Sequence, residues 1–242
     1  FVIWLSSAQA VSWVIMFYGF AVFIKPLTVE FGWSKAEITG AFTLSLLVVG
    51  LFSISAGSIL DRFGGRWLMT GASALGAVLL FVAARIDTLT AYYAVWIGLG
   101  LAMAATLYPS GFAVVVATLG TRARQGVTLM TLVAGFASTV FIPLISLLID
   151  RVDWRDSFTL LGVILLVICV PIHAYVLRLE RVPGAGQSGR PRIFSIDLKA
   201  GPVADALRNP VLWWIGVCFT ANSFVMAGVT VHIIPLMLER GF

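Results

Sequence analysis

The sequence has 242 residues, of which 60% are apolar and 11% are charged, and its formal net charge is +5. A soluble domain usually carries about 25% charged residues, so this composition excludes an ordinary soluble protein. The basic residues lie between long apolar runs, so their excess is explained by orientation in a membrane and requires no nucleic-acid partner.

Seven stretches contain no Asp, Glu, Lys or Arg, and each reaches the ~17–25 residues that a helix needs to cross a ~30 Å hydrocarbon core. The sequence therefore predicts an all-α membrane protein with spans within 1–24, 38–60, 67–84, 88–121, 125–149, 157–177 and 209–238. Phe1 already lies inside an apolar run, and the chain stops directly after the last run. We therefore expect a fragment of a longer protein. The stretch 1–24 lacks the basic start of a signal peptide.

The segments between the spans alternate in basic content. Those after spans two, four and six hold ten Lys and Arg residues, and the other connecting segments hold five. The positive-inside rule places the richer set in the cytoplasm, together with the amino terminus. We therefore expect a multi-pass protein of the plasma membrane, the inner membrane if the source is bacterial, surrounded by lipid.

The chain divides at one long, Pro-, Gly- and Arg-rich segment. The prediction is a six-helix bundle over 1–178, a cytoplasmic linker over 179–209 and the first helix of a second bundle over 210–242. Asp61-Arg62-x-x-x-Arg66 after span two is echoed by Asp150-Arg151-x-x-x-Arg155 after span five. The echo suggests 3+3 inverted repeats, although Asp and Arg are also common at helix ends.

Local signals mark several helix ends and contacts. Ser34 and Glu37 form a capping box that opens span two. Tyr108-Pro109 predicts a kink in span four, with a freed carbonyl bonded by a neighbour or by water. Gly98, Gly100 and Ala102 predict a close helix contact in the same span.

The segment between spans two and three, Gly57–Arg66, has the pattern G-x-x-x-D-R-x-G-x-R. Gly57 would let the end of span two approach a neighbouring helix, and Gly64 with Gly65 would permit a tight turn. Asp61 can pair with a basic residue or with a helix amino terminus. A generic turn with Arg62 and Arg66 at the membrane surface is the alternative. The pattern resembles the loop signature of the major facilitator superfamily.

Two further segments resemble the monocarboxylate transporter and oxalate/formate antiporter branch of that family: Phe23–Ser34, and Val152-Asp153-Trp154-Arg155 before span six. The resemblance implies a parent of twelve helices, with a cavity between two six-helix halves and alternating access. Helices 8–12 would then be missing partners. The chain departs from related patterns in two spans. Span four lacks the Arg that is often found in proton-coupled members of the family, and Trp96 lies near that position. In span five, only Gly135 and Pro143 remain of a Gly-Pro signature found in antiporters.

Three residues are candidates for substrate binding. Lys25 is expected to close span one, and the resemblance links it to binding of a carboxylate or a proton. The alternative is that Lys25 anchors the helix among the lipid headgroups. Tyr18 lies seven residues earlier on roughly the same face, although a lipid-facing tyrosine is equally ordinary. Asn222 is expected near mid-bilayer in span seven, with helix packing as the alternative.

His232 and His173 are the two histidines that could sense a proton, and His232 is the candidate proton sensor; a structural role is the alternative for both. No Asp or Glu lies within a span, and no catalytic, cofactor or metal site is indicated. The sequence favours secondary transport of a small organic anion, a mono- or dicarboxylate, by proton symport or exchange. The alternatives are a transporter of an unrelated drug or sugar, a membrane-embedded enzyme and a receptor.

Overall fold

The structure of the chain is a computed structural model that describes residues 1–179 and 208–239. The side chains at 137, 138, 142, 150, 179, 227, 230–232, 234–236, 238 and 239 are outside that description. The chain divides into two compact units, Phe1–Ser188 and Gly189–Phe242, and each is described by itself. The division falls within the predicted linker, most of which lies outside the described residues.

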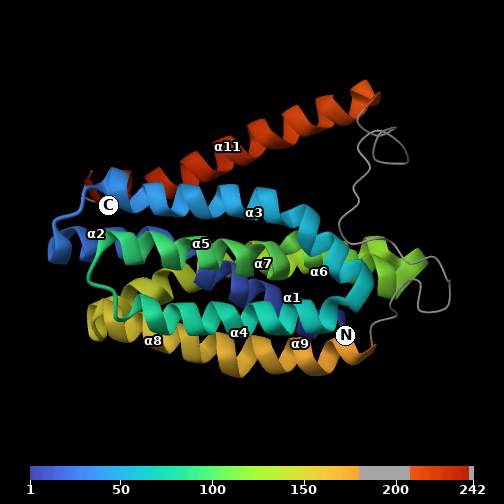
Figure 1. Cartoon of the computed structure of the whole chain (residues 1–242), viewed down its shortest axis with the longest axis horizontal. Helices are drawn as coiled ribbons and strands as arrows, with labels where there is room; N and C mark the ends of the chain where they lie inside the picture. Colours follow the sequence, from blue (N-terminus) through green and yellow to red (C-terminus); the bar gives the residue numbers. More distant parts are fainter. Residues whose placement is uncertain (180–207, 240–242) are drawn as a thin grey trace. The chain divides into compact units, whose positions relative to one another are not determined.

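The first unit, called the six-span unit below, is helical over nearly all of its described length (Figure 1). Four helical runs have the length and apolar composition of single spans: Val2–Phe31, Lys35–Phe63, Gly65–Ala83 and Trp154–Val176. A further run, Leu89–Ile149, has 61 residues. At ~1.5 Å per residue it would be about 90 Å long, three times the hydrocarbon thickness, so it must cross twice. The two crossings meet at a 3-10 turn, where Gly120 has a φ of 53°.

The elements follow the chain in order. Span 1 is α1 (Val2–Trp13), the π-helical turn η1 (Val14–Tyr18) and α2 (Phe20–Phe31), and span 2 is α3 (Lys35–Phe63). Span 3 is α4 (Gly65–Ala83), and span 4 is α5 (Leu89–Thr106) with α6 (Tyr108–Leu119). The turn η2 (Gly120–Arg122) leads to span 5, α7 (Ala123–Arg151). Span 6 is α8 (Trp154–Ile164), the π-turn η3 (Leu165–Cys169) and α9 (Val170–Val176), followed by η4 (Leu177–Leu179).

The second unit contains α11 (Pro210–Glu239), a helix of 30 residues. Asn209 caps its start, because its Oδ1 accepts a hydrogen bond from the backbone N–H of Val211 at 3.0 Å. Pro210 occupies the first helical position, where its missing N–H costs nothing. The length is sufficient for one membrane crossing, as the sequence predicts for span seven.

Several predicted local signals are confirmed. Ser34 and Glu37 form both bonds of the capping box at the start of α3. Gly64 ends α3 with a φ of 80°, a conformation that favours glycine. In α5, a Cβ added to Gly100 would lie 2.6 Å from the Ser45 carbonyl oxygen, and one added to Gly98 would lie 2.7 Å from Leu79. The predicted close contact therefore packs span 4 against spans 2 and 3.

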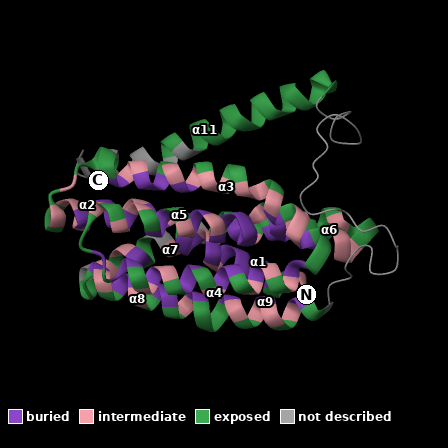
Figure 2. Ribbon diagram, viewed as in Figure 1, coloured by how far each residue is buried: buried purple, intermediate pink, exposed green. Residues whose placement is uncertain are grey.

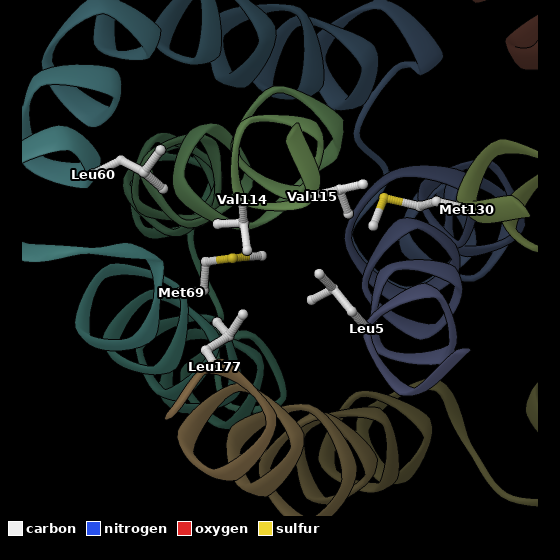
Figure 3. Close-up of a cluster of buried hydrophobic side chains, with 7 residues drawn as sticks. All are labelled: Leu5, Leu60, Met69, Val114, Val115, Met130 and Leu177. Atoms are coloured by element: carbon white, nitrogen blue, oxygen red, sulfur yellow. The ribbon is translucent and has the colours of Figure 1, made fainter. Parts of the chain in front are cut away.

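A buried cluster shows that the six spans alternate in direction. Leu5, Met69 and Met130 lie near the starts of spans 1, 3 and 5, and Leu60, Val114, Val115 and Leu177 lie near the ends of spans 2, 4 and 6. All seven side chains belong to one cluster, in which Met69 points toward Val114 and Met130 toward Val115 (Figure 3). The starts of spans 1, 3 and 5 therefore lie at the same end of the bundle as the ends of spans 2, 4 and 6. This end is called the amino-terminal end of the bundle below.

The opposite end of the bundle is held by a charged group instead. The Arg155 guanidinium, at the start of span 6, donates to Glu30 at the end of span 1 and to Asp87 after span 3, at 2.9 and 3.1 Å. Trp154 Nε1 donates to the other Glu30 carboxylate oxygen. Asp61-Arg62-x-x-x-Arg66 and Asp150-Arg151-x-x-x-Arg155 thus lie at opposite ends, as inverted repeats require.

Span 1 is far more enclosed than span 2: 56% of the residues in its most apolar stretch are buried, against 17% for α3. Much of α1 is accordingly coloured as buried and much of α3 as exposed or intermediate (Figure 2). Side chains of span 1 contact spans 2, 4 and 6, as in the pairs Phe20–Phe42, Trp13–Tyr108 and Phe23–Phe158. The candidate site is built around span 1.

Candidate substrate path in the six-span unit

The middle of span 1 carries an aromatic group that contacts span 4. Trp13 lies beside Tyr18, with ring centroids 5.9 Å apart, and beside Tyr108 of α6, at 4.7 Å. Tyr108 in turn stacks on Phe112 at 4.9 Å, and Phe17 lies 5.0 Å from Trp13. Tyr18 is the seventeenth residue of the thirty in Val2–Phe31, so the group lies near mid-bilayer.

The aromatic rings lie beside two irregularities of the backbone. The π-helical turn Val14–Tyr18 separates Trp13 from Tyr18, and such turns occur often at functional sites. Span 4 is interrupted at Leu107, whose extended conformation (φ −78°, ψ −168°) lies between α5 and α6. Tyr108 begins α6 directly after that interruption. The rings therefore lie where both helices depart from regular geometry.

The interruption confirms the kink predicted from Tyr108-Pro109 and shows how it is stabilised. The Thr106 carbonyl oxygen accepts a hydrogen bond from the Gln9 side-chain amide of α1, and Gln9 is fully buried. An unpaired carbonyl in lipid would cost roughly several kcal/mol, so the hydrogen bond from Gln9 stabilises the interruption of span 4. Of the two predicted partners of the freed carbonyl, a neighbour or water, the structure shows a neighbouring side chain.

Three hydrogen-bond donors of the aromatic group are unused within the described residues. The Trp13 Nε1–H is buried there without a partner. Neither Tyr18 nor Tyr108 makes a hydroxyl hydrogen bond among the described residues, and both side chains are half-buried. Of the three, only the Trp13 donor is buried, and an unpaired buried donor is rare in proteins and calls for an explanation such as a ligand or an ion. Donors without competing acceptors suit an anion.

The expectation that Lys25 closes span one is wrong. The helix continues through Lys25 and Pro26 and ends at Phe31, where Gly32 adopts a left-handed conformation with a φ of 68°. Pro26 does not break it, because a proline can be accommodated in a membrane helix when neighbours compensate. Lys25 is exposed and has no hydrogen-bond or ion-pair partner among the described residues. It lies seven residues from Tyr18, about 10 Å along the axis.

The signature loop Gly57–Arg66 lies at the amino-terminal end of the bundle, between α3 and α4. The predicted approach of Gly57 to a neighbouring helix is not made within the six-span unit: a Cβ there would meet nothing within 4 Å. Asp61 is exposed and forms no ion pair among the described residues. The Arg62 and Arg66 guanidiniums lie over the rings of Phe63 and Trp67, at 5.0 and 4.8 Å.

The remaining candidates lie on other elements. Asn222 lies on α11 in the other unit, with an exposed side chain, and its part in a common site stays a prediction. The side chain of His232 lies outside the described residues. His173 is fully buried between spans, and its Nδ1 is 2.9 Å from the Ser73 hydroxyl oxygen. This contact supports the structural alternative for His173.

Sequence reasoning missed Trp13 and Gln9, and treated Tyr108 only as part of a kink. No charge or motif marks these residues, since Trp and Gln within an apolar run also occur in ordinary helix contacts. The spacing of Gln9 and Trp13 could have indicated a common role, because residues four positions apart share one helix face. Only the structure shows which span that face contacts.

Together these features define a polytopic helical membrane protein with an aromatic group at mid-span, where the helices of spans 1 and 4 are irregular. The sequence matches the family profile of the Major Facilitator Superfamily over residues 6–242, and the chain belongs to that family.

Among characterised proteins, the chain is similar to the oxalate:formate antiporter of Oxalobacter formigenes, with 27% identity over 210 residues. The match covers 86% of this chain and 48% of the antiporter, so the chain spans about half the length of that relative.

Proposed function

We propose that the protein of which this chain is part is a secondary transporter of a small organic anion, a mono- or dicarboxylate, working by alternating access. The donor set of Trp13, Tyr18 and Tyr108 carries the proposal, because three unused donors at mid-span match the acceptor oxygens of a carboxylate. Family membership supports transport, and the similarity to an oxalate:formate antiporter supports an anionic substrate.

The charge on Lys25 supplies the electrostatic part of this proposal. Neutral donors orient a carboxylate but do not balance its charge, which is costly in a low-dielectric environment. An exposed ammonium about 10 Å along the helix from Tyr18 attracts an anion along the path. We place the amino terminus in the cytoplasm, so that Lys25 lies on the outward side of Tyr18. Asn222 and His232 would contribute from the second bundle.

Uptake by the complete gene product tests the proposal. Proteoliposomes are loaded with unlabelled oxalate or formate and supplied with [¹⁴C]oxalate at several external pH values. Dependence on internal anion indicates exchange, and acceleration at acid pH indicates proton symport. Tyr18→Phe removes one hydroxyl donor and is expected to raise KM about tenfold, the scale of one hydrogen bond to a charged group.

The control for that variant is Tyr175→Phe, a tyrosine near the end of span 6 whose ring contacts Arg178. It should transport as the unsubstituted protein does. Absence of uptake for every mono- and dicarboxylate, with uptake of a neutral sugar or a cationic drug instead, would replace the proposal by transport of an unrelated solute.

The open surface at Gly57 gives a second prediction. Because nothing lies within 4 Å of a Cβ there, Gly57→Leu should leave the six-span unit as stable as before. If helices of the second half pack on this surface during the transport cycle, the larger side chain should reduce Vmax about tenfold or more, a cost of about 1–3 kcal/mol for overpacking. Gly50→Leu, on the same helix and equally open, is the matched control. Equal uptake by both variants would show that Gly57 has no special contact.

A further inference from the structure

The Gln9 side chain and the aromatic group both join α1 to the interruption of span 4. Gln9 lies one helical turn before Trp13 on α1, and Thr106 and Tyr108 flank Leu107 in span 4. Gln9 donates to the Thr106 carbonyl, and Trp13 contacts the Tyr108 ring at 4.7 Å. A shift of the break relative to α1 would therefore change both contacts together.

The space for the Gln9 amide is closely defined. A Cβ added to Gly111 would lie 2.8 Å from Gln9 Nε2 and 3.1 Å from Cδ, which is too close without a shift. Glycine at 111, one turn into α6, therefore leaves the room that the amide occupies. The same turn provides Ser110, whose hydroxyl donates to the Ala104 carbonyl across the break at 3.2 Å.

Packing alone does not account for a glutamine here. The Gln9 Oε1 is buried without a partner among the described residues, and an unsatisfied buried acceptor is unfavourable. Leucine would fill a similar volume without that penalty. What glutamine adds is one donor, and that donor meets the carbonyl of the interrupted helix.

We propose that Gln9 is a positioning residue for the substrate path: its amide holds the interruption of span 4 against α1 and so keeps Tyr108 beside Trp13. The proposal rests on the proposed function where it concerns affinity, but the arrangement of the rings can be measured without any substrate. Because Gln9 does not belong to the donor set, it acts on the anion only through Tyr108 and Trp13.

The test uses the complete gene product with Gln9→Leu, which removes the donor, and Gly111→Ala, which displaces the amide from the other side. Ser6→Ala is the control, since Ser6 is fully buried on the same helix and its hydroxyl has no partner among the described residues. The first measurement is KM and Vmax for [¹⁴C]oxalate. The second is the emission of Trp13 without substrate, obtained by subtracting the spectrum of the same variant that also carries Trp13→Phe.

We expect Gln9→Leu and Gly111→Ala each to raise KM about tenfold with Vmax nearly unchanged, and to shift Trp13 emission to longer wavelength. The double variant should be little worse than either single variant, because both remove one contact. Ser6→Ala should match the unsubstituted protein in both measurements.

Unchanged Trp13 emission in both variants would overturn the proposal, as would a fall in Vmax with unchanged KM and emission, which indicates a purely structural role. If the unsubstituted protein takes up no oxalate, the proposed substrate class is wrong, and the emission measurement alone decides the positioning role. A Gln9→Leu variant that does not fold leaves the decision to Gly111→Ala.

Discussion

Replacing Arg155 with alanine is expected to lower the unfolding temperature of the protein by about 4–8 °C, the change that corresponds to about 2 kcal/mol in a domain of this size. The Arg155 Nη2 atom contacts the Glu30 and Asp87 carboxylates, and Nη1 donates to the carbonyls of Ala84 and Ile86 at 3.2 and 3.3 Å. One side chain thus joins the end of span 1, the segment after span 3 and the start of span 6.

The size of this effect follows from what Arg155 bonds and how exposed it is. Its side chain is 30% exposed, so water and salt screen part of the attraction to Glu30, and a simple sum of charge-assisted bonds would be too large. The carbonyls of Ala84 and Ile86 add to the effect because they lie where α4 ends, and helix ends leave carbonyls unbonded. The Arg155 guanidinium also lies over the Trp154 ring at 4.5 Å.

Arg151→Ala is the matched control for Arg155→Ala. Arg151 lies four residues earlier, at the end of α7, is exposed and makes no hydrogen bond or ion pair among the described residues. Arg155→Lys keeps the charge but cannot reach two carboxylates and two carbonyls at once, so it should show an intermediate loss. Thermal unfolding of purified protein in detergent measures all three. Equal unfolding temperatures for Arg155→Ala and Arg151→Ala would show that the contacts of Arg155 do not stabilise the protein.

The spans were predictable because lipid requires long apolar segments with internally bonded backbones, and the charge-free runs report that requirement directly. Their ends were less predictable. Charges at a helix end in the headgroup region are not helix breakers, so α2 continues past Lys25 to Phe31, and α8 begins at Trp154, before the predicted run at 157. Glycine with a positive φ, as at Gly32 and Gly64, marks the true ends of α2 and α3.

The candidate site was predictable only in part, for a physical reason. Tyr18 and Lys25 share one helix, and helical periodicity relates their positions without any knowledge of the fold. Trp13, Tyr108 and Gln9 become a group only when span 4 lies against span 1, a contact between residues almost one hundred positions apart. Sequence spacing carries no information about such a contact. The contribution of Asn222 depends on the second bundle and is beyond the six-span unit.

Lys25→Ala is expected to reduce anion uptake by the complete gene product about tenfold to a hundredfold at low substrate concentration, while leaving its insertion and stability unchanged. The Lys25 ammonium is exposed and unpaired among the described residues, so its removal breaks no contact there and costs little stability. An anion in the path would lose a charge-assisted interaction of about 1.5–3 kcal/mol, or about tenfold to a hundredfold in affinity. Uptake of [¹⁴C]oxalate in proteoliposomes, at matched protein content, measures the effect.

Two controls separate charge from anchoring. Lys25→Arg keeps the positive charge and should retain most of the uptake. Arg85→Ala removes another exposed cation from the same end of the bundle, where Arg85 donates to the Phe81 carbonyl at 3.0 Å, and should transport normally. If Lys25 were only an interfacial anchor, Lys25→Ala and Arg85→Ala would behave alike, because loss of either cation changes headgroup contacts equally. Full uptake by Lys25→Ala would therefore assign Lys25 to the membrane surface and leave Trp13, Tyr18 and Tyr108 as the anion-binding groups of span 1 and span 4.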